Sequence, residues 1–194
     1  MVHAFSIVTK LGDLAILFPL AALMLAWQTV RRPRGAAICW LAAFVICVST
    51  IALFKMLFYA CPPAGDFRNP SGHAALSTFV YGGFVTVIAA DLGAWWRWSV
   101  IVMGGVLIAA IAMSRVFLND HSLLEVLFGL IVGVSCLAMF CLKYLSSRIE
   151  SVPLPAFGLG LIAILLLLYG HPVHAEGFLH RISGYLNVHD VVCR

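Results

Sequence analysis

The chain alternates between long apolar runs and short polar stretches, and this pattern predicts membrane-spanning helices. The apolar runs cover about residues 11–30, 36–60, 70–90, 96–117, 121–144 and 153–169. A helix needs about 20 apolar residues to cross a bilayer, and at this spacing only helices satisfy the backbone polar groups inside it. The sequence therefore predicts an all-α fold, a multi-pass transmembrane bundle of about six helices, with residues 1–10 as a short lead-in.

Composition supports a membrane protein. The 194 residues are 63% hydrophobic and only 10% charged, with a mean hydropathy of +1.05, whereas soluble domains carry about a quarter charged residues. No cleavable signal peptide is evident. We expect a single transmembrane domain over residues 1–194, with the chemical motifs at about 55–130 and a polar tail at about 171–194. A net charge of +4 is too small and scattered to indicate a nucleic-acid partner.

The distribution of lysine and arginine predicts the orientation. One set of connections carries Arg31, Arg32, Arg34, Arg97, Lys143 and Arg148. The other side carries Lys10, Arg181 and Arg194, apart from the basic residues assigned below to a site. Because cytoplasmic loops are enriched in basic residues, the first set is expected inside. We therefore expect a multi-pass protein of the cell (inner) membrane with both termini outside.

The six cysteines form no CxxC pair, and most lie inside apolar runs. Small buried hydrophobic side chains are the simplest interpretation for those. Cys61 and Cys193 share the outer compartment in the predicted topology, so a disulfide between them is one option.

Three polar clusters interrupt the apolar runs between Lys55 and Glu125. The first is Lys55, the second is 68–73 and the third is 114–125. Ionisable groups at membrane depth are tolerated when they pair, line a cavity or act in function. The predicted topology brings all three clusters to the extracytoplasmic face, where we expect them to form one phosphate-binding catalytic site.

The tetrapeptide Pro70-Ser71-Gly72-His73 opens the third apolar run. Ser71 suits an N-cap position, and the unpaired N–H groups that follow attract an anion such as phosphate. Gly72 lets the anion approach the backbone, and His73 lies in the first turn beside it. An ordinary capped helix with a chance histidine is the alternative.

His121 and Glu125 are four residues apart, so on a helix they share one face. The carboxylate then fixes the imidazole tautomer and leaves the other ring nitrogen free as a base or nucleophile. Arg115 offers bidentate binding of phosphate oxygens, and Lys55 adds a point charge. A plain His–Glu helix pair, an Arg115 helix-end anchor and a snorkelling Lys55 are the alternatives.

These motifs resemble those of the type 2 phosphatidic acid phosphatase (PAP2) superfamily, within it the bacterial membrane lipid phosphatases. The family pattern is Lys-x6-Arg-Pro, then Pro-Ser-Gly-His, then Ser-Arg-x5-His-x3-Asp. Pro70-Ser71-Gly72-His73 is intact, and Ser114-Arg115-x5-His121-x3-Glu125 differs by one acidic residue. Lys55-x6 leads to Pro62-Pro63, so the first arginine is absent, and Arg68 is the natural replacement.

The resemblance implies a hydrolase, a metal-independent lipid phosphatase without a cofactor. His121 is then the nucleophile that forms a phosphohistidine, His73 the general acid and base, and Glu125 the partner of His121. The phosphate-binding residues are Lys55, Arg68, Ser71, Gly72 and Arg115. The partners are a lipid phosphate substrate, such as undecaprenyl diphosphate, phosphatidylglycerol phosphate, phosphatidic acid or a lipid A phosphate, and the membrane lipids. A lipid phosphotransferase and a non-catalytic phosphate-binding subunit stay open, as does the oligomeric state.

Overall fold

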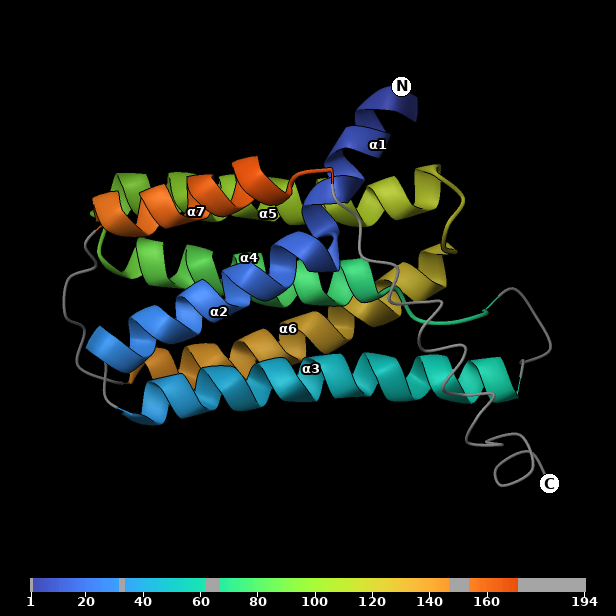
Figure 1. Ribbon diagram of the computed structural model, residues 1–194, viewed down its shortest axis with the longest axis horizontal. Coiled ribbons are helices and arrows are strands. Elements are labelled where there is room, and N and C mark those ends of the chain that lie inside the picture. The colour runs from blue at the N-terminus through green and yellow to red at the C-terminus, as the bar shows by residue number, and fades with distance from the viewer. Residues whose placement is uncertain (1, 32–33, 62–66, 147–153, 171–194) are drawn as a thin grey trace.

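A computed structural model describes residues 2–31, 34–61, 67–146 and 154–170 of the chain, and the expected all-α bundle is confirmed in that part (Figure 1). The helices are α1 (Val2–Thr9), η1 (Lys10–Gly12), α2 (Leu14–Arg31), α3 (Arg34–Ala60), α4 (Gly72–Ala90), α5 (Ala94–Phe117), α6 (Leu123–Leu145) and α7 (Leu154–Leu168). The expected polar tail at 171–194 lies outside the described residues.

Four of these helices, α3 to α6, are long and apolar enough to cross a membrane. The first expected span is broken: residues 5–12 and 14–30 meet at an angle of 43°. Asp13 explains the break, because its backbone N–H closes η1 on the Lys10 carbonyl (3.2 Å) while its side chain accepts the Ala15 N–H (2.9 Å) at the start of α2. The last expected span is the 15-residue helix α7, shorter than the about 20 residues that a crossing requires.

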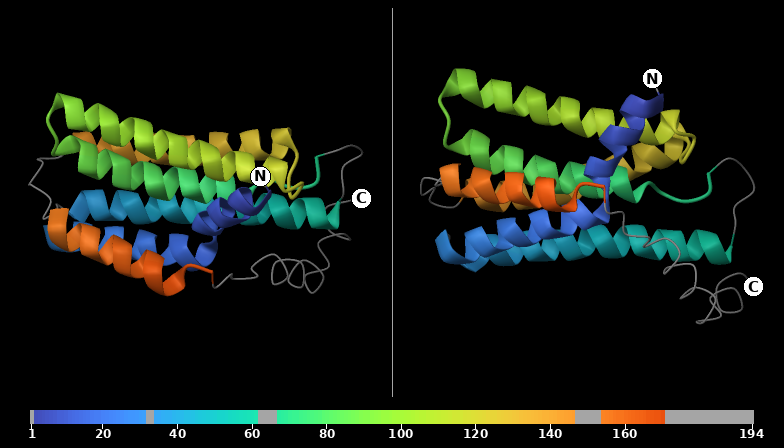
Figure 2. Two further views of the ribbon diagram at one scale, coloured as in Figure 1. Left: turned by 90° about the horizontal axis from the view of Figure 1, so that it is seen from above. Right: turned by 45° about the horizontal axis from the view of Figure 1, so that its top comes forward.

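Helix α4 is the centre of the bundle, with α3, α5 and α6 around it (Figures 1 and 2). Its side chains are buried on nearly every face, which is why its sequence lacks a single apolar stripe. Two adjacent glycines allow close neighbours, since Gly82 faces Leu137 of α6 and Gly83 faces the Trp40 ring of α3. Trp40 also stacks on Phe79 with ring centroids 4.4 Å apart. In this part of the core, small residues of α4 thus make room for large side chains of the neighbouring helices.

A second pair of glycines brings α6 against the beginning of α4. A Cβ added at Gly129 would collide with the Ser71 carbonyl, and one at Gly133 would collide with the Ala75 carbonyl. The spacing Gly129-x3-Gly133 is the small-residue pattern that lets membrane helices approach closely. This contact fixes the start of α4 beside the start of α6, where the site lies.

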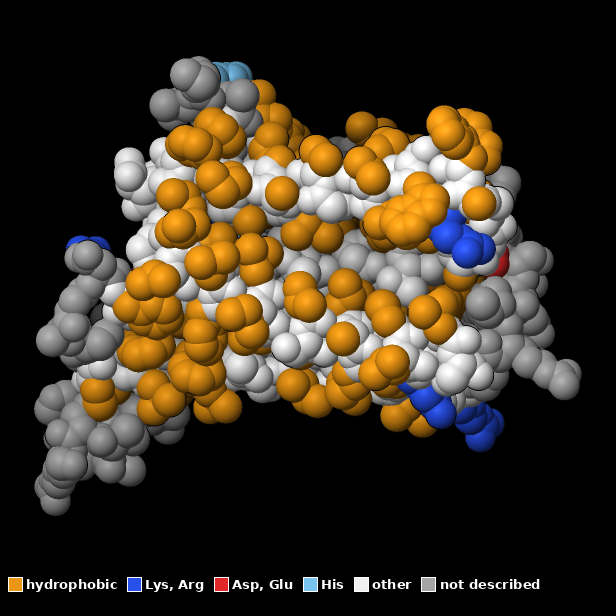
Figure 3. All heavy atoms as spheres, turned by 180° about the vertical axis from the view of Figure 1, so that it is seen from behind, with side chains coloured by type: hydrophobic (Ala, Val, Ile, Leu, Met, Phe, Trp, Pro, Cys, Tyr) orange, Lys and Arg blue, Asp and Glu red, His pale blue; other side chains and the backbone are white. Residues whose placement is uncertain are grey.

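On the face seen in Figure 3, most of the visible lysine and arginine side-chain surface lies at one end of the bundle, with a smaller group at the other end, and hydrophobic side chains cover the length between them. At the first of these ends Arg97 donates from Nε to the Ala89 carbonyl (3.1 Å). Lys143 lies here too, since a Cβ added at Gly35 would be 3.3 Å from its Cε. Exposed apolar side chains run along α3, α5 and α6, as expected of helices that face lipid.

Candidate active site

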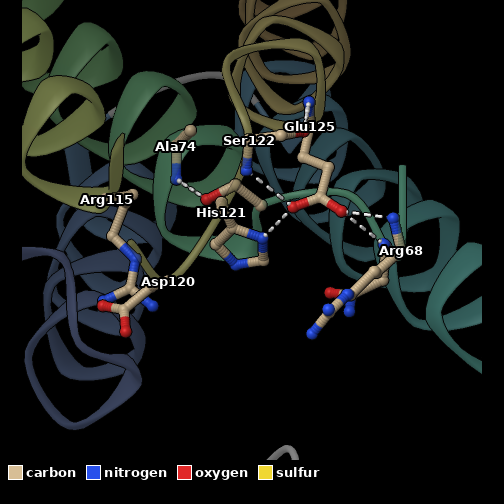
Figure 4. A network of polar contacts seen from close by, with 9 residues as sticks. Arg68, Ala74, Arg115, Asp120, His121, Ser122 and Glu125 are labelled. Carbon is tan, nitrogen blue, oxygen red and sulfur yellow. Dashed lines mark hydrogen bonds and ion pairs between the residues drawn. The ribbon is translucent and has the colours of Figure 1, made fainter. Parts of the chain in front are cut away.

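At the other end of the bundle, away from Arg97 and Lys143, the Glu125 carboxylate accepts hydrogen bonds from several parts of the chain. Its Oε1 accepts the backbone N–H groups of Arg68 and of Asn69 (2.9 Å), and its Oε2 accepts the Ser122 N–H (3.0 Å). Oε2 also lies 2.9 Å from Nδ1 of His121 (Figure 4). Glu125 is 3% exposed, so a buried charge is stabilised by four donors from two separate stretches of chain.

Local backbone structure places His121 beside this carboxylate. Helix α5 ends in a Schellman motif, in which the Asn119 N–H bonds the Val116 carbonyl and the Asp120 N–H bonds the Arg115 carbonyl. Asn119 has φ 57°, a left-handed conformation that asparagine tolerates better than most residues. The chain then reverses at once, and Ser122 starts α6 with a capping box on Glu125. These two end signals account for the short interval between Arg115 and Glu125.

The imidazole of His121 is oriented by Glu125, and its surroundings favour the neutral ring. Burial lowers the pKa of His121 because water no longer solvates its charged form. Nearby Lys55 and Arg115 lower this pKa further, while the bond to Glu125 opposes them. Since Nδ1 faces Glu125, Nε2 points to the opposite side of the ring, toward the space flanked by the Arg68 and Arg115 side chains in Figure 4. An unprotonated nitrogen thus faces a cationic surrounding.

The start of α4 approaches the same place. Ser71 is the N-cap, as expected, and its Oγ accepts the Ala74 N–H at 3.4 Å. The Ser71 N–H bonds the Glu125 carbonyl (3.1 Å), which links the start of α4 directly to α6. A Cβ at Gly72 would lie 4.0 Å from Cε of Lys55. Lys55, at 4% exposure, therefore extends to the helix N-terminus rather than to the membrane surface.

The segment that carries Arg68 is packed against two helices, α3 and α6. The Phe67 ring packs edge-on against Phe58 of α3 (5.2 Å) and Phe128 of α6 (6.1 Å between centroids). The Arg68 backbone N–H then meets Glu125. The Arg68 side chain itself is exposed, and in Figure 4 it extends on the side of the His121 ring away from Glu125. Its predicted role in binding phosphate stays a prediction.

Arg115 is held by two oxygens. Its Nη1 donates to Oγ1 of Thr9 in α1 at 3.0 Å and lies 2.9 Å from Oδ2 of Asp120. Its Nε is buried and has no hydrogen-bond partner among the described residues. The guanidinium is therefore tied to the N-terminal helix as well as to the loop that carries His121.

The N-terminal segment is a part of the site that sequence reasoning missed. Besides Thr9 at Arg115, Gly12 lies against His73, since a Cβ there would be 3.1 Å from the ring atom Cδ2. Tyr81 of α4 donates its hydroxyl to the Leu11 carbonyl (2.7 Å). Residues 1–10 carry no sequence pattern that ties them to the motifs, so their contact with the site could not be predicted. Asn119 was likewise missed, and Asp120 was predicted only as a member of the third cluster, without a role of its own.

The arrangement so far defines a class: an all-helical membrane protein with a buried histidine–glutamate pair, a helix N-terminus and cationic side chains at one end. The comparisons agree with it. Residues 56–149, just under half of the chain, match the model of the PAP2 superfamily, which supports the superfamily that the motifs resemble. Its members are generally phosphatases, or phosphotransferases, which supports a hydrolase at the level of class.

One relative is an uncharacterized 22.5 kDa protein in the cps region of Klebsiella pneumoniae. It is 27% identical over 187 residues, a match that covers 92% of this chain and 90% of the relative. No solved structure gives a significant match.

Proposed function

We propose that the protein is a membrane-embedded lipid phosphate or diphosphate phosphatase that works through a phosphohistidine. The observation that carries the proposal is the His121 imidazole, whose Nδ1 is fixed by Glu125 at 2.9 Å and whose Nε2 faces cations. A nucleophile needs this combination: a neutral ring, a fixed tautomer, and positive charge where the phosphoryl oxygens will lie.

The proposed reaction has two in-line steps. In the first, Nε2 of His121 forms a bond to phosphorus while the bond from phosphorus to the lipid oxygen breaks, and His73 gives its proton to that oxygen. In the second, His73 takes a proton from water, the water oxygen attacks phosphorus, and the bond to Nε2 breaks. Inorganic phosphate leaves and both histidines return to their starting states.

Charge on the three equatorial oxygens is the main obstacle in phosphoryl transfer, so cations and N–H groups supply most of the stabilisation. We assign this role to Lys55, Arg68, Ser71, Gly72 and Arg115. The buried position of Lys55 near Gly72 supports it, because a desolvated ammonium at a helix N-terminus adds to the positive potential there. Neutralisation by side chains would make a metal unnecessary, and we expect chelators to leave turnover unchanged.

A lipid substrate is favoured by the surroundings of the site. Four phenylalanine rings form a continuous cluster from α3 across to α6, next to Arg68: Phe54, Phe58, Phe67 and Phe128. Leu124 and Leu127, on the first turns of α6, are also exposed. A phosphate bound at the site would therefore have apolar surface directly beside it. Undecaprenyl diphosphate, phosphatidylglycerol phosphate and similar lipids all satisfy this condition.

We place the site on the extracytoplasmic side of the cell membrane. The basic residues Arg97 and Lys143 lie at the opposite end of the bundle, as the positive-inside rule requires. Cys61, just after α3 at the site end, is disulfide-bonded, which is typical of an oxidising compartment. The four other described cysteines are free. Cys193, its predicted partner, lies outside the described residues, and that pairing stays a prediction.

A panel of lipid phosphates tests the proposal. Purified wild-type protein should release inorganic phosphate from at least one lipid of the panel, with and without EDTA, and His121→Ala should release none. Lipid phosphorylation without phosphate release would instead indicate the phosphotransferase. Binding of phosphate with neither reaction would indicate the non-catalytic subunit. Loss of activity in EDTA, reversed by a divalent ion, would contradict the metal-independent mechanism.

A further inference from the structure

Arg115 already has an anionic partner in the absence of substrate. Asp120 Oδ2 lies 2.9 Å from Nη1, and the same nitrogen donates to Thr9 Oγ1 at 3.0 Å. The Arg115 side chain is 12% exposed, and the Asp120 side chain is 42% exposed. The cation is therefore enclosed, while the carboxylate paired with it lies at the open side of the contact.

The backbone keeps Asp120 next to Arg115 whether or not the side chains are paired. The Asp120 N–H bonds the Arg115 carbonyl at 3.1 Å, and the His121 N–H bonds the same oxygen at 3.2 Å. The carboxylate thus has a high effective concentration at the guanidinium, as any tethered ligand does. It can swing away into solvent and return without any movement of the helix.

Thr9 and Asp120 differ in what they do to an incoming phosphate. The Thr9 hydroxyl is neutral and leaves the positive charge of Arg115 available, whereas the Asp120 carboxylate neutralises it. A guanidinium binds phosphate most strongly through two of its N–H groups, and Nε of Arg115 is buried without a partner among the described residues. Substrate and Asp120 therefore compete for one cation, while Thr9 holds that cation in place.

We propose that Asp120 is an internal counter-ion that the phosphate group displaces from Arg115 and that returns to favour release of the product phosphate. Thr9 is the positioning residue that keeps the guanidinium aimed during the exchange. This inference rests on the proposed function and adds a determinant of phosphate affinity to it. Its consequence is unusual for a site residue: removing the charge of Asp120 should tighten binding.

Inorganic phosphate is the probe, because it is the product and carries no lipid tail. Its Kd is measured by calorimetry on the purified full chain in detergent. Asp120→Asn, which keeps the size and loses the charge, should lower this Kd about two- to fivefold, the upper part of the range for a partly exposed ion pair. KM for the lipid should fall in parallel. Asp91 is the C-cap of α4, at the end of the bundle away from the site. Asp91→Asn removes the same charge there and should change neither constant.

Variants of Thr9 test the second part of the proposal, in which the predicted change in phosphate affinity has the opposite sign. Thr9→Val should raise the Kd of inorganic phosphate about three- to tenfold, because the guanidinium loses its neutral anchor. Thr9→Ser keeps the hydroxyl and should restore wild-type binding. A residue that only supports folding would weaken binding in both the Asp120 and Thr9 variants and would lower Tm in both.

The outcomes separate this inference from the function on which it rests. Wild-type protein that releases phosphate, with an Asp120→Asn variant that binds phosphate no tighter, overturns the role of Asp120 alone. Asp120→Ser provides the same comparison if the asparagine variant has a lowered Tm. Wild-type protein that neither binds nor releases phosphate contradicts the proposed function, and the counter-ion inference fails with it.

Discussion

The two ends of the bundle are built from the same helices, and their arginines behave differently. Arg97 donates to the carbonyls of Ala89 and Leu92, eight and five residues away. Arg115 instead binds Thr9, 106 residues away, and Glu125 accepts N–H groups from residues 56 and 57 positions earlier. Arg97 is thus satisfied by nearby backbone, whereas Arg115 and Glu125 have partners from distant parts of the chain as well as local ones.

This difference indicates what each end is for. Arg97 completes the C-terminus of α4, which requires no precise tertiary geometry. At the other end, buried charges stay in place only because α1, α3, α4 and α6 meet there, and that requirement has a cost in desolvation. Functional sites in membrane proteins typically bring charged side chains together in this way, although burying them lowers stability. Each prediction below tests whether this contrast is functional.

The largest expected effect is the loss of the nucleophile. His121→Ala should lower kcat for phosphate release by at least about 10⁴-fold, because it removes the nitrogen that forms the covalent intermediate. Arg97→Ala at the opposite end should keep kcat/KM within about twofold, with a modest decrease in Tm from the lost helix-end contacts. Equal losses in the two variants would remove the functional distinction between the ends.

The second-largest expected effect on kcat comes from substitution of Glu125. Glu125→Gln should lower kcat by roughly 10³- to 10⁴-fold, because the amide disturbs the imidazole tautomer and no longer stabilises a charged ring. Glu125→Asp, the acid of the family pattern, retains the charge and should retain much more activity. Steady-state kinetics on both variants give the comparison. Equal kcat in the glutamine variant and the wild type would reduce Glu125 to a helix cap.

The contact between α4 and α6 next to the site should contribute more to stability than packing on the lipid-facing surface. Gly129→Ala places a methyl group against the Ser71 carbonyl, whereas a Cβ at Gly105 meets nothing within 4 Å. We expect the first substitution to destabilise the protein by about 1–3 kcal/mol and the second to leave stability unchanged or slightly raised. Thermal unfolding in detergent measures both. A Gly129→Ala variant as stable as Gly105→Ala would show that the α4–α6 contact is not tight.

Arg68 has a smaller expected effect, because its side chain is exposed. Arg68→Ala should lower kcat/KM about 10- to 100-fold if the side chain replaces the arginine missing from the first motif. The backbone N–H to Glu125 is kept in this variant, so the hydrogen bonds of Glu125 are unaffected. A wild-type kcat/KM would assign Arg68 to backbone support alone.

Much of the fold was predictable from hydrophobic pattern, because residues between turns must form helices in lipid. The Ser71 cap was also predictable. The contact of His121 with Glu125 was predicted too, but from a shared helix face, and that reason was wrong: His121 precedes α6, which begins at Leu123, and the loop and capping box before that helix bring the two side chains together. The contact of Thr9 with the site was not predictable, because a threonine in a lead-in helix carries no local signal. Asp120 lies in the third cluster, but its pairing with Arg115 was not predicted. Their roles arise only from tertiary contact with Arg115.

The last predicted span, 153–169, is the shortest of the six, and the structure gives a still shorter helix of 15 residues there. Residues 153–169 are apolar throughout, and apolar composition alone does not decide where a helix begins. Gly129 and Gly133 form a Gly-x3-Gly pattern, and glycines outside that pattern, Gly82 and Gly104, also face neighbouring side chains. Pattern thus identifies which helices can approach closely, and tertiary structure decides which of them meet at the site.

The smallest effect is a displacement of the pH profile, and it tests the electrostatic contrast directly. Burial lowers the pKa of His121, and the charge of Lys55 lowers it further. Because the neutral ring is the nucleophile, kcat/KM should fall as pH drops through this pKa, with a midpoint below the ordinary histidine value of about 6.5. Lys55→Gln removes one repelling charge, so the midpoint should move to higher pH, while Arg97→Ala should leave it in place. A wild-type midpoint at or above about 6.5, or no displacement in Lys55→Gln, would mean that the cations at the site end do not act on His121.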